Sequence, residues 1–139
     1  MCQDFEWIQF LRLAQVMAGD SPGEAITPDC EQRTIANRAY YAAYNLAKQY
    51  LVEVDATRFE SERPTHKAVR EWYFKRGRET GNTDLSQVAR LLVRSYNERH
   101  AADYDAAGRS FATASVKVVE WAEQVVRKLR SIRAGGQAA

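Results

Sequence analysis

Glycine and proline, the residues that most often interrupt helices, are few in this chain and largely confined to short clusters. The 139 residues include 7 glycines and 3 prolines, and most of these fall between residues 19 and 28, at Pro64, or at Gly77 and Gly81. Between these breaks the apolar residues recur at steps of three and four, which is the spacing of one helical face. No segment shows a strand pattern that would compete with the helical interpretation. The sequence therefore predicts an all-α protein.

The breaks divide the chain into four long helices and a short one. Short connections favour antiparallel neighbours, so the expected architecture is an up-and-down antiparallel helical bundle. Residues 1–133 are expected to form a single domain, and the AGGQAA tail at 134–139 to be disordered. The helices are expected at about residues 4–18, 29–54, 64–76, from 83 or 84 into the stretch 94–105, and at about 105–132.

Two helices carry faces suited to close packing. In the second helix a seam of small residues recurs at steps of three and four and lets another backbone approach closely; it consists of Ala36, Ala39, Ala43, Ala47 and, at its end, Tyr50. The last helix has a heptad-like seam made of Phe111, Ser115, Val118, Ala122, Val125, Leu129 and Ile132. The first helix is apolar over most of its circumference, so it is buried either in its own bundle or against a partner subunit. For the short third helix, Pro64 marks the start and Gly77 the position just past the end.

The overall composition excludes several classes of protein. Cys2 and Cys30 are the only cysteines and lie far apart, which favours reduced thiols in a cytoplasmic protein. Together with two histidines they do not make a zinc site. No basic signal segment and no run of eighteen apolar residues is present, so no membrane association is expected. A net charge of +2 does not by itself predict a nucleic-acid partner, and no phosphate-binding glycine loop, cofactor or metal is expected.

The stretch RSYNERHAADYD, residues 94–105, concentrates polar and charged side chains around one histidine. His100 has neighbours three or four residues away, which on a helix lie beside it: Asn97, Asp103 and Tyr104. Arg94 lies six residues back, about 240° further round a helix, and so does not share the face of His100. The two residues can act on one ligand only if the helix ends or bends between them, or if a second subunit supplies the other half.

These residue types suit cleavage of RNA without a metal. Histidine transfers protons near neutral pH, so His100 would take the 2′-hydroxyl proton or protonate the leaving 5′-oxygen. The forked donors of Arg94 would hold the phosphate and stabilise the charge that builds on it. The alternative is a structural helix junction, in which Asp103 or Asp105 caps the last helix and Arg99 or Arg94 pairs with it.

Other residues permit two interpretations in the same way. His66 opens the third helix and is either a second proton-transfer or phosphate-contacting group, or a capping and packing residue. Arg38 and Tyr41 belong to a mixture of cations and aromatic rings that can hold single-stranded RNA by stacking and phosphate contact. The same mixture is also ordinary for an amphipathic helix with half-buried tyrosines.

Three segments, in order, resemble the HEPN-domain family. RTIANRAYYAAYNLAKQYL at residues 33–51 is similar to the RAYYAAYH-like helix of that family, and THKAVREWYF at 65–74 resembles its third helix, which begins at a histidine. RHAADYD at 99–105 resembles the R-x-x-ADYD signature of one branch, the branch found beside minimal nucleotidyltransferases in toxin–antitoxin pairs. The resemblance covers about residues 31–129.

The resemblance implies a helical bundle that forms a homodimer. Many HEPN proteins are metal-independent endoribonucleases whose arginine and histidine, four to six residues apart, meet across the dimer, and Arg94 and His100 fit that pattern. Arg99 matches the arginine of the signature instead. Two departures are present: the position of His100 is commonly not histidine in this branch, and Asn45 stands where the family often has histidine. His100 is therefore either an active-site residue or a surface histidine.

The leading hypothesis is a metal-independent endoribonuclease, the toxin half of a toxin–antitoxin pair. Its catalytic residues would be Arg94 and His100, and residues that orient them or contact RNA would be Arg99, Asn97, Asp103, Tyr104, Arg38, Tyr41 and His66. The alternative is a non-catalytic HEPN module that binds a separate nucleotidyltransferase chain or holds RNA or nucleotide for it.

Overall fold

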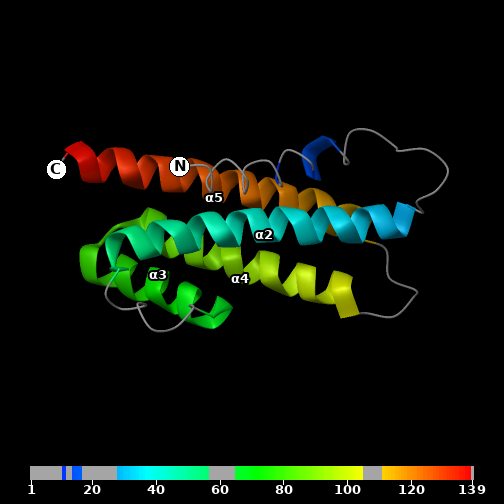
Figure 1. Ribbon diagram of the computed structural model, residues 1–139, viewed down its shortest axis with the longest axis horizontal. Helices are drawn as coiled ribbons and strands as arrows, with labels where there is room; N and C mark the ends of the chain where they lie inside the picture. Colours follow the sequence, from blue (N-terminus) through cyan, green and yellow to red (C-terminus); the bar gives the residue numbers. More distant parts are fainter. Residues whose placement is uncertain (1–10, 12–13, 17–27, 57–64, 105–110, 139) are drawn as a thin grey trace.

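The computed structural model describes residues 11, 14–16, 28–56, 65–104 and 111–138. Four helices have their bounds in these ranges, and no strand occurs in them, so the all-α prediction is confirmed (Figure 1). The helices are α2 (Pro28–Val54), α3 (His66–Thr80), α4 (Thr83–Tyr104) and α5 (Ala112–Ala138). Most of the predicted helix at 4–18 lies outside the described residues; within it, Leu11 and Ala14 are helical and buried.

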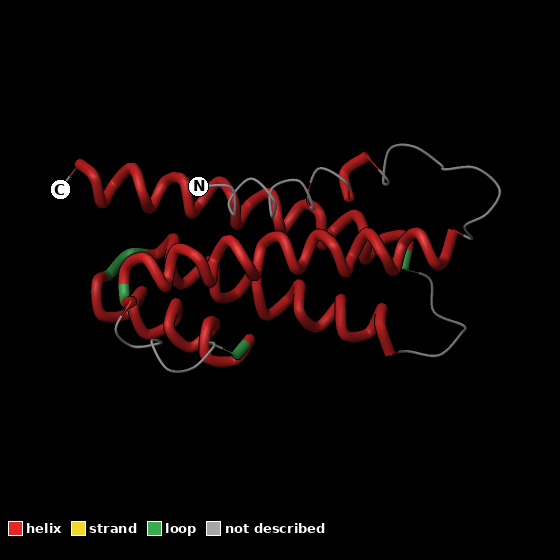
Figure 2. The backbone as a smooth tube through the Cα atoms, viewed as in Figure 1, coloured by secondary structure: helices red, strands yellow, loops and turns green. Residues whose placement is uncertain are grey.

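Contacts between helix ends fix the direction of each helix in the bundle. Near the start of α2, the Arg33 side chain donates to the Ala102 carbonyl at the end of α4, at 2.8 Å. At the other end, Arg133 of α5 pairs with Glu53 of α2 at 3.0 Å. The helices α2 and α5 therefore run in the same direction and α4 runs against both (Figure 2). Helix α3 runs with α2, because His66 at its start lies beside Tyr40 and Tyr73 further along donates to the Ala47 carbonyl.

The predicted packing faces form the core between α2, α4 and α5. All four seam alanines of α2 are fully buried, and the small side chains bring the α2 backbone close to its neighbours. The heptad-like seam of α5 is also buried along its whole length, from Phe111 to Ile132. The described helices include none that combines the length and apolarity needed to cross a bilayer.

Helix α3 is longer than predicted because Gly77 lies inside it. The helix continues to Thr80 and ends where Gly81 adopts a left-handed conformation with φ of 70°. Gly77 is buried against α4, and a Cβ atom there would stand 2.2 Å from Ser86 Oγ and 2.9 Å from Ser86 N. The glycine is thus required for close packing of α3 on α4, and the predicted helix end at Gly77 is wrong.

The junction between α4 and α5 also differs from the prediction. Asp103 belongs to α4, which continues to Tyr104, and α5 begins at Ala112 instead of near residue 105. The Phe111 carbonyl accepts the first hydrogen bond of α5, from Ser115 N at 2.8 Å, so Asp103 is not the residue at which this helix starts. The other predicted cap, Asp105, lies outside the described residues. At its other end α5 continues past Ile132 into the stretch expected to be disordered, as far as Ala138.

Candidate functional site

His66 lies at the centre of an aromatic cluster between α2, α3 and α4. Its ring stacks on Tyr44 with centroids 4.1 Å apart, and three more tyrosine rings lie within about 6 Å. Two arginines complete the group. We call it the His66 cluster; it consists of His66, Tyr40, Tyr41, Tyr44, Arg70, Tyr96 and Arg99.

Local sequence rules place these rings together. Thr65 caps α3 by accepting a hydrogen bond from Ala68 N at 3.1 Å, which makes His66 the first residue of the helix and directs it towards α2. Tyr40 and Tyr44 are one helical turn apart on α2 and stack on each other at 6.0 Å. The cluster therefore depends on the packing of α3 against the tyrosine face of α2.

Arg99 is a buried cation enclosed by aromatic rings. Its side chain is only 7% exposed, and its guanidinium lies 5.1 to 5.4 Å from the ring centroids of Tyr40, Tyr41 and Tyr96. Its Nη1 also donates to the Tyr41 hydroxyl at 3.5 Å. Such stacking stabilises a guanidinium that has been withdrawn from water.

Arg70 adds a second cation beside the same rings. It lies four residues after His66 on α3, and its guanidinium stands 4.8 Å above the Tyr96 ring. Its Nη1 is buried and has no hydrogen-bond partner among the residues that the structure describes. The His66 cluster is therefore rich in positive charge as well as in aromatic surface.

This environment keeps His66 neutral. Burial lowers the pKa of His66 below its ordinary value of 6.5, and the positive charges of Arg99 and Arg70 lower it further. Burial also raises the pKa of the Tyr40 hydroxyl, so that group retains its proton. The Tyr40 hydroxyl lies 2.5 Å from His66 Nδ1. A protonated phenol donates to an unprotonated nitrogen, which assigns the single proton of His66 to Nε2.

The predicted catalytic residues are both exposed on α4 but lie on different flanks of it. His100 packs at the edge of the His66 cluster, with its ring centroid 5.9 Å from that of Tyr96. Arg94 instead lines a groove between α4 and α5, beside Arg90 and Gln124. Because α4 is unbroken from Thr83 to Tyr104, the helix does not end between the two residues, which was one way in which they could have acted on one ligand.

The other predicted site residues separate into three groups. His66, Tyr41 and Arg99 converge in the His66 cluster, as described above. Asn97 and Arg38 are exposed, on α4 and α2 respectively. The side chains of Asp103 and Tyr104 lie outside the described residues. Among the residues that the structure describes, no group of histidine, cysteine and acidic side chains is suited to a metal ion.

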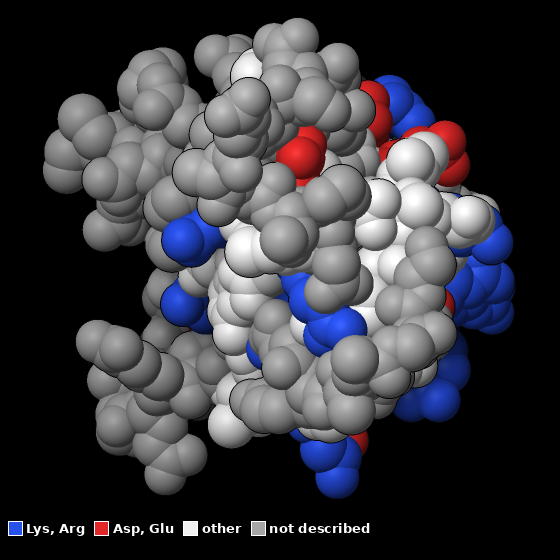
Figure 3. Space-filling view, turned by 90° about the vertical axis from the view of Figure 1, so that its right-hand side faces the viewer, with Lys and Arg blue, Asp and Glu red and all other residues white. Residues whose placement is uncertain are grey.

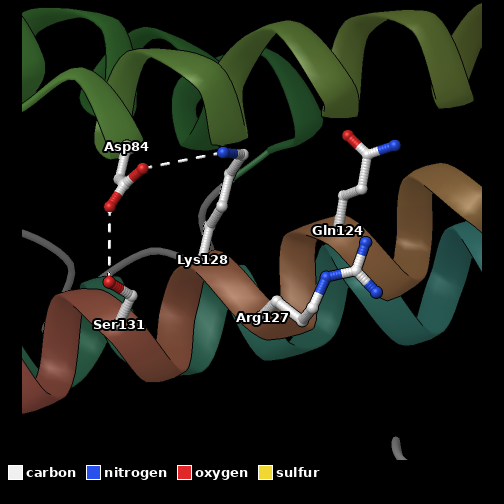
Figure 4. Close-up of a pocket in the computed structure, with 5 residues that line it drawn as sticks. All are labelled: Asp84, Gln124, Arg127, Lys128 and Ser131. Carbon is white, nitrogen blue, oxygen red and sulfur yellow. Dashed lines mark hydrogen bonds and ion pairs between the residues drawn. The ribbon is translucent and has the colours of Figure 1, made fainter.

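The sequence interpretation missed two features of this region. Arg70 was not identified, although its position four residues after His66 on one helix is a readable signal. The groove between α4 and α5 was missed as well, because it joins residues of two helices whose relative register is not visible in the sequence. Its lining includes Asp84, Lys128 and Ser131 at one end, where Lys128 Nζ lies 3.6 Å from Asp84 Oδ1 (Figure 4).

The partly exposed members of the His66 cluster, Tyr41, Tyr96 and Arg70, offer aromatic surface and one cation, whereas Tyr40, Tyr44 and Arg99 are buried. Aromatic rings stack on nucleobases, and arginine donors bind phosphate oxygens. A neutral imidazole among cations does not readily become protonated, but it can donate a hydrogen bond to an anion through Nε2–H.

Comparison of the chain with protein-family models, with curated proteins and with solved structures finds no match.

Proposed function

We propose that this chain is a HEPN-type, RNA-directed protein that acts as a homodimer and cleaves RNA without a metal ion. In this proposal it is the toxin half of a toxin–antitoxin pair. The observation that carries it is the position of His100, whose exposed imidazole lies at the edge of a cluster of tyrosines and arginines. A substrate bound beside His100 would thus lie next to the Tyr96 ring, over which the partly exposed Arg70 stands.

The proposed reaction is an internal transfer at one phosphate of the RNA. The 2′-oxygen forms a bond to phosphorus, the bond from phosphorus to the 5′-oxygen breaks, and a cyclic phosphate results. His100 either accepts the 2′-hydroxyl proton or donates a proton to the leaving 5′-oxygen, and water completes the other proton transfer. Arg94 neutralises the charge that builds on the phosphate. Because Arg94 and His100 lie on different flanks of one α4, each active site combines Arg94 of one subunit with His100 of the other.

A cleavage assay in EDTA tests the chemistry. His100→Ala and Arg94→Ala are each expected to lower the cleavage rate about 100- to 10,000-fold, the range for loss of an acid–base group or of transition-state charge stabilisation. Arg78→Ala, which removes an exposed arginine on α3, is the matched control and should retain wild-type activity. Equal cleavage by wild type and His100→Ala would remove His100 from the mechanism.

Mixing the two inactive variants tests the shared site. A dimer that contains one Arg94→Ala chain and one His100→Ala chain keeps one intact site if the two residues act across the interface. Random mixing should then restore about a quarter of wild-type activity, because half the dimers are mixed and each has one working site of two. If both residues act within one chain, mixing restores nothing.

A second candidate is a non-catalytic HEPN module that binds RNA, or binds a separate nucleotidyltransferase chain. The position of Arg94 and His100 on different flanks of a continuous α4 favours it, because one chain then lacks a complete catalytic pair. In the same assays this candidate predicts that the wild type binds RNA without cleaving it. Co-purification with a nucleotidyltransferase chain would support its partner-binding form.

A further inference from the structure

A groove lies between α4 and α5. It consists of two adjoining cavities of about 390 and 310 Å³ that share Gln124 and Lys128 in their walls. One end is lined by Asp84 and Ser131, and the other by Arg90 and Arg94.

The charges that line this groove are mostly positive, and one of them is already neutralised. Asp84 is the single carboxylate among the described residues of its walls, and Lys128 lies 3.6 Å from it. Lys128 also donates to Gln87 at 2.5 Å, and Ser131 donates to Asp84 at 3.5 Å. Figure 4 shows the contacts of Asp84 with Lys128 and Ser131, which bridge the two helices at one end of the groove. These contacts give Lys128 and Asp84 a structural role as a pair that joins the two helices.

Three arginines of the groove are not explained in this way. Arg90, Arg94 and Arg127 are exposed, and within the described ranges no carboxylate is paired with them. Arg90 and Arg94 are one turn apart on α4, about 6 Å along the helix axis. Arg127 stands on α5, in the wall of the adjoining cavity (Figure 4). Basic side chains also gather along one flank of the molecule when it is viewed from its end (Figure 3).

We infer that the groove between α4 and α5 binds a chain of consecutive phosphate groups, such as the backbone of single-stranded RNA or inorganic polyphosphate. Guanidinium groups spaced along a channel can each take one phosphate, and their forked donors match its oxygens. Gln124, which borders both cavities, offers an amide between the arginines. In its RNA form the inference rests on the proposed function and adds the path of the RNA backbone, with Arg94 at the point where the groove and the proposed catalytic site meet.

Fluorescence anisotropy on the full chain tests this, with a labelled single-stranded RNA as one probe and inorganic polyphosphate as an unlabelled competitor. The test variant is Arg90→Gln/Arg127→Gln, in which Arg94 is kept because it belongs to the proposed catalytic pair. The control is Arg76→Gln/Arg78→Gln, which removes the same charge from exposed positions on α3, a helix that does not pack on α5. Circular dichroism checks that both variants are folded.

The expected result has a defined size. Each phosphate contact contributes a slope of about 0.7 to the dependence of log K on log salt for single strands, so loss of two contacts lowers the slope by about 1.4. At 0.1 M salt this corresponds to roughly 25-fold weaker binding. The control should keep the wild-type slope. Polyphosphate should compete with RNA for the wild type and lose this ability in the groove variant.

The alternative outcomes separate the inference from the proposed function. RNA binding that falls equally in the groove variant and the control would overturn the groove, while the RNA-directed function would stand. Direct binding of labelled polyphosphate in the groove, without any RNA binding, would keep the groove and overturn the RNA-directed function. Failure of both ligands would overturn both. A change of oligomeric state in the groove variant, measured by gel filtration, would mean that protein covers the groove and would also overturn the inference.

Discussion

Substitution of Gly77 by alanine tests how closely α3 must pack on α4, and therefore how the His66 cluster is assembled. Gly77 lies within α3 and faces the first turns of α4. An added Cβ would stand 2.2 Å from Ser86 Oγ, 2.9 Å from Ser86 N and 3.2 Å from the Asn82 carbonyl. The Ser86 hydroxyl can rotate away, but the two backbone atoms move only if α3 moves away from α4.

Two opposing terms decide the outcome. Alanine is favoured over glycine in a helix interior by about 1 kcal/mol. An extra methyl group in a packed interface costs about 1 to 3 kcal/mol, and contact with backbone atoms places this site in the upper part of that range. We therefore expect Gly77→Ala to lower the free energy of unfolding by about 1 to 2 kcal/mol. For a chain of this size that corresponds to a melting temperature lower by about 3 to 7 °C.

Urea unfolding followed by circular dichroism measures this difference, and Gly135→Ala is the control. Gly135 is helical and exposed, and a Cβ there meets nothing within 4 Å, so the control should be neutral or slightly stabilised. The double variant Gly77→Ala/Ser86→Ala removes the nearest atom and should recover part of the loss. If Gly77→Ala alone is as stable as the wild type, close approach of α3 and α4 is not what requires glycine at this position.

Three further predictions concern the aromatic interior. The pKa of His66 is lower in the folded protein than in the unfolded chain, so its contribution to stability should be fully present above pH 6.5 and fall as the pH drops below it. Urea midpoints measured from pH 5 to 8 should show this loss of stability in the wild type and not in His66→Phe. Arg99→Met removes a cation beside this ring and should raise the pKa of His66, and an unchanged NMR titration would contradict the stated role of Arg99. Tyr73→Phe deletes a hydroxyl that donates to the Ala47 carbonyl at 2.6 Å in the core, and should cost about 1 kcal/mol in urea unfolding, whereas Tyr50→Phe should cost close to nothing.

The core was readable from the sequence because burial follows helical periodicity. The alanine seam of α2 and the seam from Phe111 to Ile132 are buried as predicted, since each is a one-dimensional pattern along a single helix. Helix ends were less readable. Gly77 looked like a terminator, but its role is set by a neighbouring helix, which no local rule describes. For the same reason Asp103 looked like a cap and is instead part of α4.

Most residues of the candidate site could be identified from the sequence, but which of them lie together was harder to predict. His66, Tyr41 and Arg99 were identified from residue type, and they meet although they lie on three different helices. Arg70 was within reach of the same reasoning, because it shares a face with His66. The groove between α4 and α5 was not within reach, because its arginines come from two helices and only their packed register brings Arg90, Arg94 and Arg127 to one channel.

The continuity of α4 limits how Arg94 and His100 can cooperate. Six residues on a helix separate the two by about 240° of rotation and about 9 Å of rise, so one phosphate cannot meet both unless the helix breaks. Between and beside them Ser95, Arg99 and Ala102 are buried against neighbouring helices, and a break would withdraw these contacts. A catalytic role for both residues therefore requires two chains, and catalysis would then depend on assembly. If the chain instead acts alone, Arg94 belongs to the groove and His100 to the His66 cluster, and the protein holds its ligand without cutting it.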